Sequence, residues 1–179
     1  MHSLGTPIRD DLGTTRYTTQ QSMLDTHVPH GAHYYWRAGY MGAGSLTDTA
    51  AAALLDRVAA ITSPTSLISL EHVGGRINHC APSDTAFPHR SATYNLLICS
   101  AWDRQRPATE HVRFADECWH AMAPYMLGNS LYQNYGSADA RAVYADNYAR
   151  LAALKHKFDP DQRLTGNGLF ADLKKGEES

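Results

Sequence analysis

The sequence predicts an α+β fold, an antiparallel sheet with helices packed mainly on one face, and three observations lead to it. Strand-sized segments such as 33–41 alternate aromatic and polar residues, which is typical of half-buried antiparallel strands. The paired glycines Gly74 and Gly75 close another such segment and indicate a hairpin. Segments with apolar residues at helical spacing separate the strands, and 179 residues are enough for one domain.

The first third of the chain contains an arm, a strand and a helix. Residues 1–30 are rich in Thr, Gly, Pro and Asp without a sustained period, so we expect a lead-in arm. Residues 33–41 form the first strand, and alternation divides its side chains between two faces: Tyr34, Trp36, Ala38 and Tyr40 on one, Tyr35, Arg37 and Gly39 on the other. A helix follows over 48–62, with Thr47 or Ser45 as N-cap and Pro64 as stop.

The middle third is predicted to supply most of the sheet. Residues 65–75 form a strand that ends at the paired glycines, and 76–81 form its hairpin return or a bulged edge. Residues 81–91 are a turn-rich loop. The segment 91–102 is apolar on both faces and is therefore expected to be the most buried strand.

The last third is predicted to be mainly helical. Residues 109–126 show helical spacing of apolar positions, and Pro124 ends or bends that helix. Residues 131–135 form a short strand, and 138–160 form a helix that stops at Pro160. The charged tail that follows is expected to fray.

Composition excludes several classes of function. A net charge of −2 and scattered Lys and Arg residues provide no basic face, so nucleic acid is not an expected partner. Cys80, Cys99 and Cys118 are an odd number without paired spacing, which argues against disulfides and a zinc cluster. No apolar run could span a membrane and the N-terminus has no signal-peptide core, so we expect a cytoplasmic protein.

Metal, nucleotide and hydrolase motifs are also missing from the sequence. His27, His30 and His33 stand at three-residue steps, but Pro29 and Gly31 would break the helix that could gather them around a metal. The segment "GGRINH" lacks the spacing of a phosphate-binding glycine loop, and there is no "GxSxG" elbow. We therefore predict no metal site and no nucleotide site built from this chain alone.

Polar residues on the predicted strands remain as candidate site residues. A tyrosine phenol held near a polarised acceptor can act as an acid or a base. His72 could also act as an acid or a base, although its alternation with Ile68 and Leu70 is equally typical of a core histidine. Arg37 or Glu71 could instead be exposed or held in an ion pair. The full candidate set is Arg37, Glu71, His72, Asn95, Tyr132, Asn134 and Tyr135.

The segment "LYQNYGSADARAVYADNYARLAALKHKFDP" resembles the C-terminal region of the berberine bridge enzyme family of FAD-linked oxidases. The family pattern is roughly Y-x-N-Y, then Y-G-x-N-Y-x-R-L, then K-x-x-[FY]-D-P. Upstream, "GGRINHCAPSDTAFPHRSATYNL" and "HYYWR" resemble a strand end, a loop and an aromatic strand of the same family, so the likeness runs from about Gly5 to Asp159. The matched C-terminal positions are Tyr132, Asn134, Tyr135, Tyr144, Asn147, Tyr148, Arg150, Leu151, Lys155, Asp159 and Pro160.

The resemblance implies a large antiparallel sheet whose face forms a substrate pocket above the flavin. Residues 31–127 would be the sheet and helices of the substrate-binding domain, 128–170 a C-terminal berberine-bridge-like segment and 171–179 a charged tail. Tyr132 would be catalytic, with His72 as a second candidate. Arg37, Glu71, Asn95, Asn134 and Tyr135 would bind the substrate, whereas His89 and Arg90 would anchor a loop.

Two departures from the family pattern limit that expectation. The FAD-binding domain of the family has no counterpart in these residues, so we expect FAD only if a partner supplies its site. Ala145 replaces the usual glycine, and "DQRLTGNGLF", with Asn167, replaces the family's closing segment.

Three functions stay open from the sequence. The first is the substrate-binding part of a flavin oxidoreductase acting on a small organic, secondary metabolite together with an FAD-binding partner chain. The second is a cofactor-independent isomerase, dehydratase or cyclase, expected as a homodimer, that uses Tyr132, His72 or Glu71 for proton transfer. The third is a non-catalytic protein that binds a small molecule.

Overall fold

The computed structural model describes residues 13–23, 25, 28, 30–135 and 140–164. The chain divides into two compact units, Met1–Gly31 and Ala32–Ser179, which are described separately. In the first unit, the short helix α1 (Tyr17–Gln21) lies within the predicted arm. Residues 1–12, His27 and the predicted tail 171–179 lie outside the described residues.

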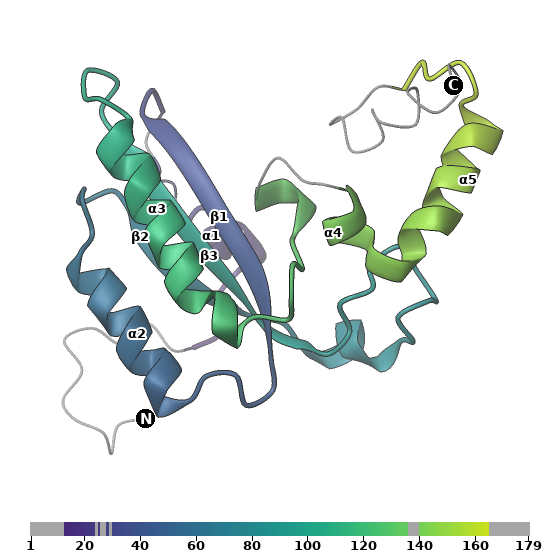
Figure 1. The fold of residues 1–179 in the computed structure, drawn as a ribbon, viewed down its shortest axis with the longest axis horizontal. Helices are drawn as coiled ribbons and strands as arrows, with labels where there is room; N and C mark the ends of the chain where they lie inside the picture. Colours follow the sequence, from purple (N-terminus) through teal and green to yellow (C-terminus); the bar gives the residue numbers. More distant parts are fainter. Residues whose placement is uncertain (1–12, 24, 26–27, 29, 136–139, 165–179) are drawn as a thin grey trace. The chain divides into compact units, whose positions relative to one another are not determined.

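The second unit is built on a three-stranded antiparallel sheet (Figure 1). Its strands are β1 (His33–Gly42), β2 (Leu67–His72) and β3 (Ala92–Trp102), and β3 lies between the other two. The register pairs Asn95 of β3 with Tyr40 of β1 and with Glu71 of β2. These three side chains therefore form a row across one face of the sheet.

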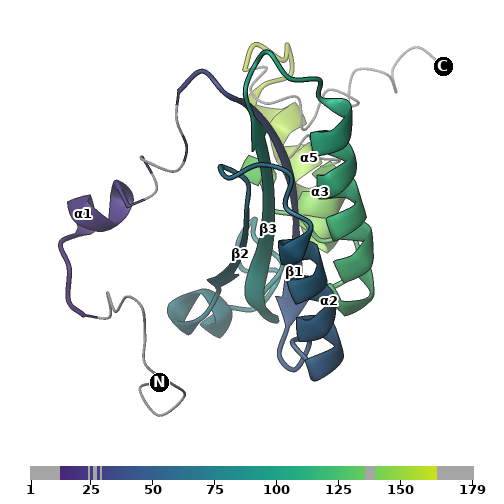
Figure 2. The same ribbon diagram turned by 90° about the vertical axis from the view of Figure 1, so that its left-hand side faces the viewer.

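Two helices cover the opposite face. Figure 2 shows α2 (Asp48–Ala59) and α3 (Thr109–Met122) side by side on the same face of the sheet. The buried core cluster joins Met41, Leu96 and Ile98 of the strands to Phe114 and Met122 of α3. The predicted α+β arrangement is confirmed, although the sheet has fewer strands than predicted.

Local sequence signals explain how the two long helices begin and end. The Thr47 hydroxyl accepts a hydrogen bond from the Ala50 amide at 3.2 Å, so the predicted N-cap of α2 is confirmed. Ser45 instead accepts the Gly42 amide at 3.1 Å. The helix α2, predicted over 48–62, ends at Ala59 rather than at residue 62. Pro124 lies in a 3-10 turn, Ala123–Tyr125, that follows α3.

Two predicted strands are wrong. Residues Gly75–His79, expected as a hairpin return, form a 3-10 turn that begins at a positive φ of 68° on Gly75. The Asn78 side chain ties this turn to the Ala92 carbonyl at 2.8 Å. Residues Gln133–Tyr135, expected within a strand over 131–135, also form a 3-10 turn, in which the Tyr135 amide bonds the Tyr132 carbonyl at 3.0 Å.

The predicted helix over 138–160 is divided in two. Residues 138 and 139 lie outside the described part of the chain. From there α4 (Ala140–Tyr144) leads through a 3-10 turn, Ala145–Asn147, into α5 (Tyr148–Phe158). The break occurs where Ala145 has a φ of 44°, a left-handed value that a helix does not continue. After this break, the side-chain amide of Asn147 donates hydrogen bonds to the Pro82 and Thr85 carbonyls at 2.7 and 3.0 Å.

Among the residues that the structure describes, none of the helices has both the length and the apolar character needed to cross a bilayer. In the same residues, no group of three or more His, Cys, Asp or Glu side chains is placed to hold a metal ion.

Candidate functional site

Glu71 is the centre of a hydrogen-bonded group on the sheet face opposite α2 and α3. Its Oε1 accepts the Tyr135 hydroxyl at 3.1 Å, and its Oε2 accepts the Asn95 side-chain amide at 2.8 Å. The Asn95 side chain is buried, with 3 % of the residue exposed. Strand pairing thus fixes the positions of Glu71 and Asn95 relative to each other. The Glu71 carboxylate then binds the hydroxyl of Tyr135, which lies 64 residues further along the chain.

Two more tyrosines complete this group, which we call the Glu71 cluster: Tyr40, Glu71, Asn95, Tyr132 and Tyr135. The rings of Tyr132 and Tyr135 meet edge to face at 5.1 Å. The Asn134 side chain donates a hydrogen bond to the Tyr132 hydroxyl at 2.8 Å. A strand would have directed Tyr132 and Tyr135 to opposite faces, and the 3-10 turn brings their rings together instead.

The environment of the cluster keeps the phenols of Tyr40 and Tyr135 protonated. Burial, followed by the nearby charge of Glu71 and the hydrogen bond to it, raises the pKa of Tyr135 to about 12. Burial also raises the pKa of Tyr40, and the charges of Tyr132, Glu71 and Tyr135 add to that effect. At neutral pH these two hydroxyls are therefore hydrogen-bond donors, and the Glu71 carboxylate is an acceptor for the Tyr135 proton.

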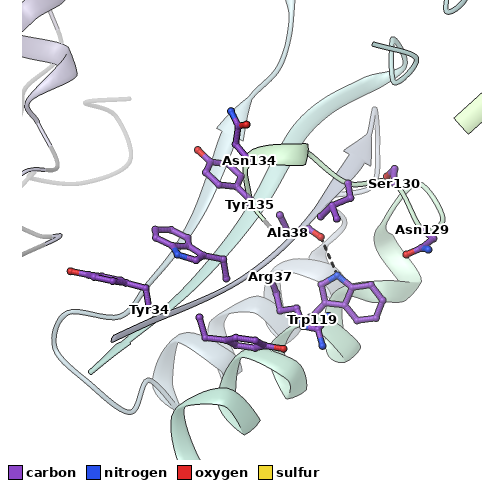
Figure 3. A pocket seen from close by; sticks show the side chains of 11 residues that line it. Tyr34, Arg37, Ala38, Trp119, Asn129, Ser130, Asn134 and Tyr135 are labelled. Carbon is purple, nitrogen blue, oxygen red and sulfur yellow. Dashed lines mark hydrogen bonds between the residues drawn. The ribbon is translucent and has the colours of Figure 1, made fainter. Parts of the chain in front are cut away.

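A cavity of about 450 Å³ adjoins the cluster (Figure 3). It lies where β1 and α3 approach the segment 129–135. Trp36 of β1 and Tyr135 of the 3-10 turn stack with ring centroids 6.0 Å apart and an interplanar angle of 14°. The lining residues are Tyr34, Tyr35, Trp36, Arg37, Ala38, Trp119, Asn129, Ser130, Leu131, Asn134 and Tyr135.

Arg37 is the cation of the cavity wall. Its Nε and one terminal nitrogen both lie 2.7 Å from Oδ1 of Asp116, so the predicted alternative of an ion pair is confirmed. Tyr35 donates its hydroxyl to the same oxygen at 3.0 Å, and the Trp119 ring lies 5.8 Å from the guanidinium carbon. Arg37 is thus held in one orientation, with part of its hydrogen-bonding capacity already used.

The cavity residues do not fit FAD. A dinucleotide carries a diphosphate, which proteins bind through several cations or through a glycine-rich turn at a helix N-terminus. The lining residues include one cation, Arg37, and it is already paired with Asp116. The volume of about 450 Å³ suits a small organic molecule.

The predicted site residues are not all brought together. Glu71, Asn95, Tyr132 and Tyr135 form the cluster, and Arg37, Asn134 and Tyr135 line the cavity. His72 lies on the other face of β2, where it is exposed and packs against Tyr94 at 5.9 Å, so it is neither a core histidine nor part of the cluster.

The loop-anchor prediction for His89 and Arg90 is confirmed. The His89 Nε2 lies 3.0 Å from the Val143 carbonyl oxygen, and Arg90 donates to the Ile77 carbonyl at 2.5 Å. Burial lowers the pKa of His89, while backbone carbonyls of Val143 and Ala142 act in the opposite direction. These contacts join the loop after β2 to α4 and to the turn at 75–79.

Sequence reasoning missed Trp36 and Tyr40 as site residues. Both were placed on one face of the first strand, but without the register of that strand nothing linked them to Glu71. The family pattern "Y-x-N-Y" drew attention to residues 132–135, whereas the aromatic residues of 33–41 indicated only a half-buried strand.

Comparisons with known proteins find oxidoreductases that match parts of this chain at low sequence identity. An FAD-linked oxidoreductase of Dictyostelium discoideum is 25% identical over 161 residues, which cover 88% of this chain and 35% of that protein. A tetrahydroberberine oxidase of Berberis wilsoniae is 27% identical over 114 residues, covering 52% of this chain and 22% of the oxidase. No family model matches the chain.

The fold has relatives among solved structures. BBE-like 1 of Physcomitrella patens superimposes with a TM-score of 0.64 and 24% identity, over 71% of this chain and 28% of that one. The chain therefore spans about a third or less of the length of these relatives. The predicted resemblance is confirmed: in sequence and in fold, the chain is similar to part of the FAD-linked oxidoreductases of the berberine bridge enzyme family.

Proposed function

We propose that this chain is the substrate-binding part of a berberine-bridge-like flavin oxidoreductase that acts on a small organic, secondary metabolite. Residues outside the chain, in an FAD-binding partner, supply the flavin site. The observation that carries the proposal is Tyr135, which lines the cavity with its ring and donates its hydroxyl to Glu71. One residue thus joins a ligand-sized space to a partly buried carboxylate.

The cavity walls indicate how a small molecule would be held. The stacked rings of Trp36 and Tyr135 offer flat apolar surface, and Arg37 and Asn134 offer hydrogen bonds. Glu71, Asn95 and Tyr132 stand behind Tyr135 and fix its orientation. We assign the binding role to Arg37, Asn134 and Tyr135, supported by Glu71 and Asn95, and keep Tyr132 as the catalytic candidate.

The domain division belongs to the same proposal. Residues 31–127 hold the sheet, α2, α3 and Glu71, while 128–170 hold the Y-x-N-Y turn that closes on them. FAD supplies the redox chemistry of such an enzyme when it is bound.

A cofactor-free acid/base enzyme is the second candidate, because Glu71 and Tyr135 are a carboxylate and a phenol in direct hydrogen bond. The elevated pKa of Tyr135, about 12, works against that candidate, since a phenol that stays protonated is a poor base at neutral pH. The same pair works well as a fixed hydrogen-bond donor for binding.

Flavin retention tests where the cofactor site lies. The purified chain is incubated with excess FAD, desalted, and scanned through the flavin absorbance bands, near about 370 and 450 nm. We expect no retained flavin. A stoichiometric flavin band would contradict the assignment of the FAD site to a partner.

Ligand titration tests the binding role. Isothermal titration calorimetry with 4-hydroxybenzyl alcohol, a ring that carries hydroxyl groups, should detect binding that Tyr135→Phe weakens about five- to tenfold, the effect of one hydrogen bond. Tyr17→Phe is the control, since Tyr17 is 73% exposed in the first unit. Equal binding by both variants would remove Tyr135 from the site.

A further inference from the structure

The charge of the cavity wall is balanced by a carboxylate that does not belong to the wall. Among the eleven residues that line the cavity, all of them described by the structure, Arg37 is the one with a formal charge. Asp116 of α3 is absent from that lining, yet its Oδ1 lies 2.7 Å from both Nε and a terminal nitrogen of Arg37. The positive charge that the cavity presents therefore has its counter-ion directly beside it.

The pair of Arg37 and Asp116 is held in place by a third group. Tyr35 and Arg37 lie two residues apart on β1, so their side chains leave the same face of the strand. Tyr35 donates its hydroxyl to the Asp116 oxygen that Arg37 contacts, at 3.0 Å. The side chains of Arg37 and Asp116 are 40% and 32% exposed, so a ligand that displaces water from the cavity would meet two charges that are less screened than those on an open surface.

The described hydrogen-bond partners of a second carboxylate near the cavity, Glu71, are both neutral. They are the hydroxyl of Tyr135 and the side-chain amide of Asn95. Tyr135 lines the cavity, so one residue separates Glu71 from it. Because Asp116 balances Arg37, these groups at and just behind the wall keep one net negative charge. Such a site repels an anionic ligand.

Arg37 remains able to bind an uncharged ligand. No described residue accepts a hydrogen bond from its other terminal nitrogen, so N–H groups are left for an oxygen atom in the cavity. The Trp119 ring, beside Arg37 in Figure 3, lies 5.8 Å from the guanidinium carbon and limits its movement. The result is a fixed hydrogen-bond donor whose charge is largely cancelled.

We propose that Asp116 determines the charge of the ligand that this cavity accepts. By balancing Arg37, it favours an uncharged ring compound that carries hydroxyl groups over an anion of the same shape. This inference rests on the proposed binding role of the cavity. Asp116 is a specificity-determining residue that acts through Arg37, because it does not itself line the cavity.

Asp116→Asn tests the proposal, because the asparagine keeps a carbonyl oxygen for Tyr35 and Arg37 but removes the negative charge. Titration calorimetry at an ionic strength of about 20 mM, where screening is weak, compares 4-hydroxybenzyl alcohol with 4-hydroxybenzoate. The wild type should bind the alcohol at least about fivefold more tightly. Asp116→Asn should raise the affinity for the benzoate about five- to tenfold, while the affinity for the alcohol stays within about twofold. Asp56→Asn is the matched control, because it removes the same charge from an exposed position on α2, and it should change neither affinity.

Fluorescence quenching measures the charge of the cavity without a bound ligand. Trp36 and Trp119 line the cavity, so iodide, an anion, and acrylamide, which is neutral, can reach their rings there, whereas Trp102 is only 6% exposed. The ratio of the iodide to the acrylamide quenching constant should rise at least about 1.5-fold in Asp116→Asn and stay unchanged in Asp56→Asn.

The outcomes distinguish the role of Asp116 from the binding role of the cavity. If the wild type binds the alcohol but a folded Asp116→Asn shows the same relative affinities, the role of Asp116 is overturned and the binding role stands. Equal quenching ratios in Asp116→Asn and Asp56→Asn would overturn the role of Asp116 as well. If all three proteins bind neither ligand, the proposed binding function is contradicted, and this inference with it. Circular dichroism melts confirm that each variant is folded.

Discussion

Tyr135 has a structural task as well as its proposed binding role, because its hydroxyl is one of two groups that satisfy Glu71. Removing that hydroxyl leaves Glu71 Oε1 without its donor at a partly buried position. Tyr135→Phe should therefore lower the free energy of unfolding by about 1 kcal/mol, the typical value of a hydrogen bond of this kind. Urea denaturation at neutral pH measures it, with Tyr17→Phe expected to be neutral.

The pH dependence of stability follows from the same phenol. Its pKa is raised to about 12 in the folded protein, above the unfolded value of about 10. Folding favours the protonated form, so this contribution is fully present below about pH 10 and is lost as the pH rises toward 12. Between those values the stability of the wild type should fall more steeply than that of Tyr135→Phe, as urea titrations at each pH would show. Parallel curves would contradict the burial of this hydroxyl.

At the scale of elements, the turn between α4 and α5 depends on one strained residue. Ala145 has a φ of 44°, and the family pattern places a glycine there. Glycine adopts this conformation without a steric cost, so Ala145→Gly should stabilise the protein by up to about 1 kcal/mol.

Ala153→Gly is the matched control for that substitution. Ala153 is exposed within α5, where glycine costs about 1 kcal/mol of helix propensity. Thermal melts of the two variants should therefore move in opposite directions. If both are destabilised, the left-handed turn is not present in solution.

The contact between β1 and the turn after α3 allows another test. A Cβ on Gly39 would collide with the Met126 side chain, which packs against the core cluster. Gly39→Ala should destabilise the protein by about 1 to 3 kcal/mol, since the flexible Met126 can move only by disturbing its own packing. Gly13→Ala meets no atom within 4 Å and should be neutral in the same denaturation experiment.

Elements with a strong local signal were predictable from the sequence. The cap at Thr47, the period of the helices and the alternation of residues 33–41 depend on neighbours along the chain, and the structure bears them out. The turns at 75–79 and 133–135 were read as strands because their residues favour extended structure. Contacts with distant groups, Ala92 and Glu71, decide their conformation instead.

At the scale of the whole molecule, the second unit contains the complete core cluster, all of whose residues lie between Tyr35 and Met126. A chain that begins at Ala32 should therefore melt within about 3 °C of the full-length protein. Differential scanning calorimetry checks this, and a loss of the cooperative transition would show that the first unit is needed for folding.

The candidate site was predictable in some of its residues but not in its shape. Glu71, Asn95, Tyr132 and Tyr135 were chosen as separate strand-borne polar groups. The register of β3 explains why Glu71 and Asn95 meet, and the 3-10 turn at 133–135 brings the two tyrosines to them. The cavity depends on the path of the chain after Gly128, whose φ of 59° has no signature in a period or a propensity.

The alternation of side chains along β2 and β3 has a consequence for how such a domain can diverge. Leu70 and Leu96 face the helices, whereas their chain neighbours Glu71 and Asn95 face the cluster. A lineage can therefore exchange the second pair for other polar residues while the first pair keeps the chain folded. Along each strand, positions that maintain the fold therefore alternate with positions that determine the chemistry, and the two sets of positions can accumulate substitutions at different rates.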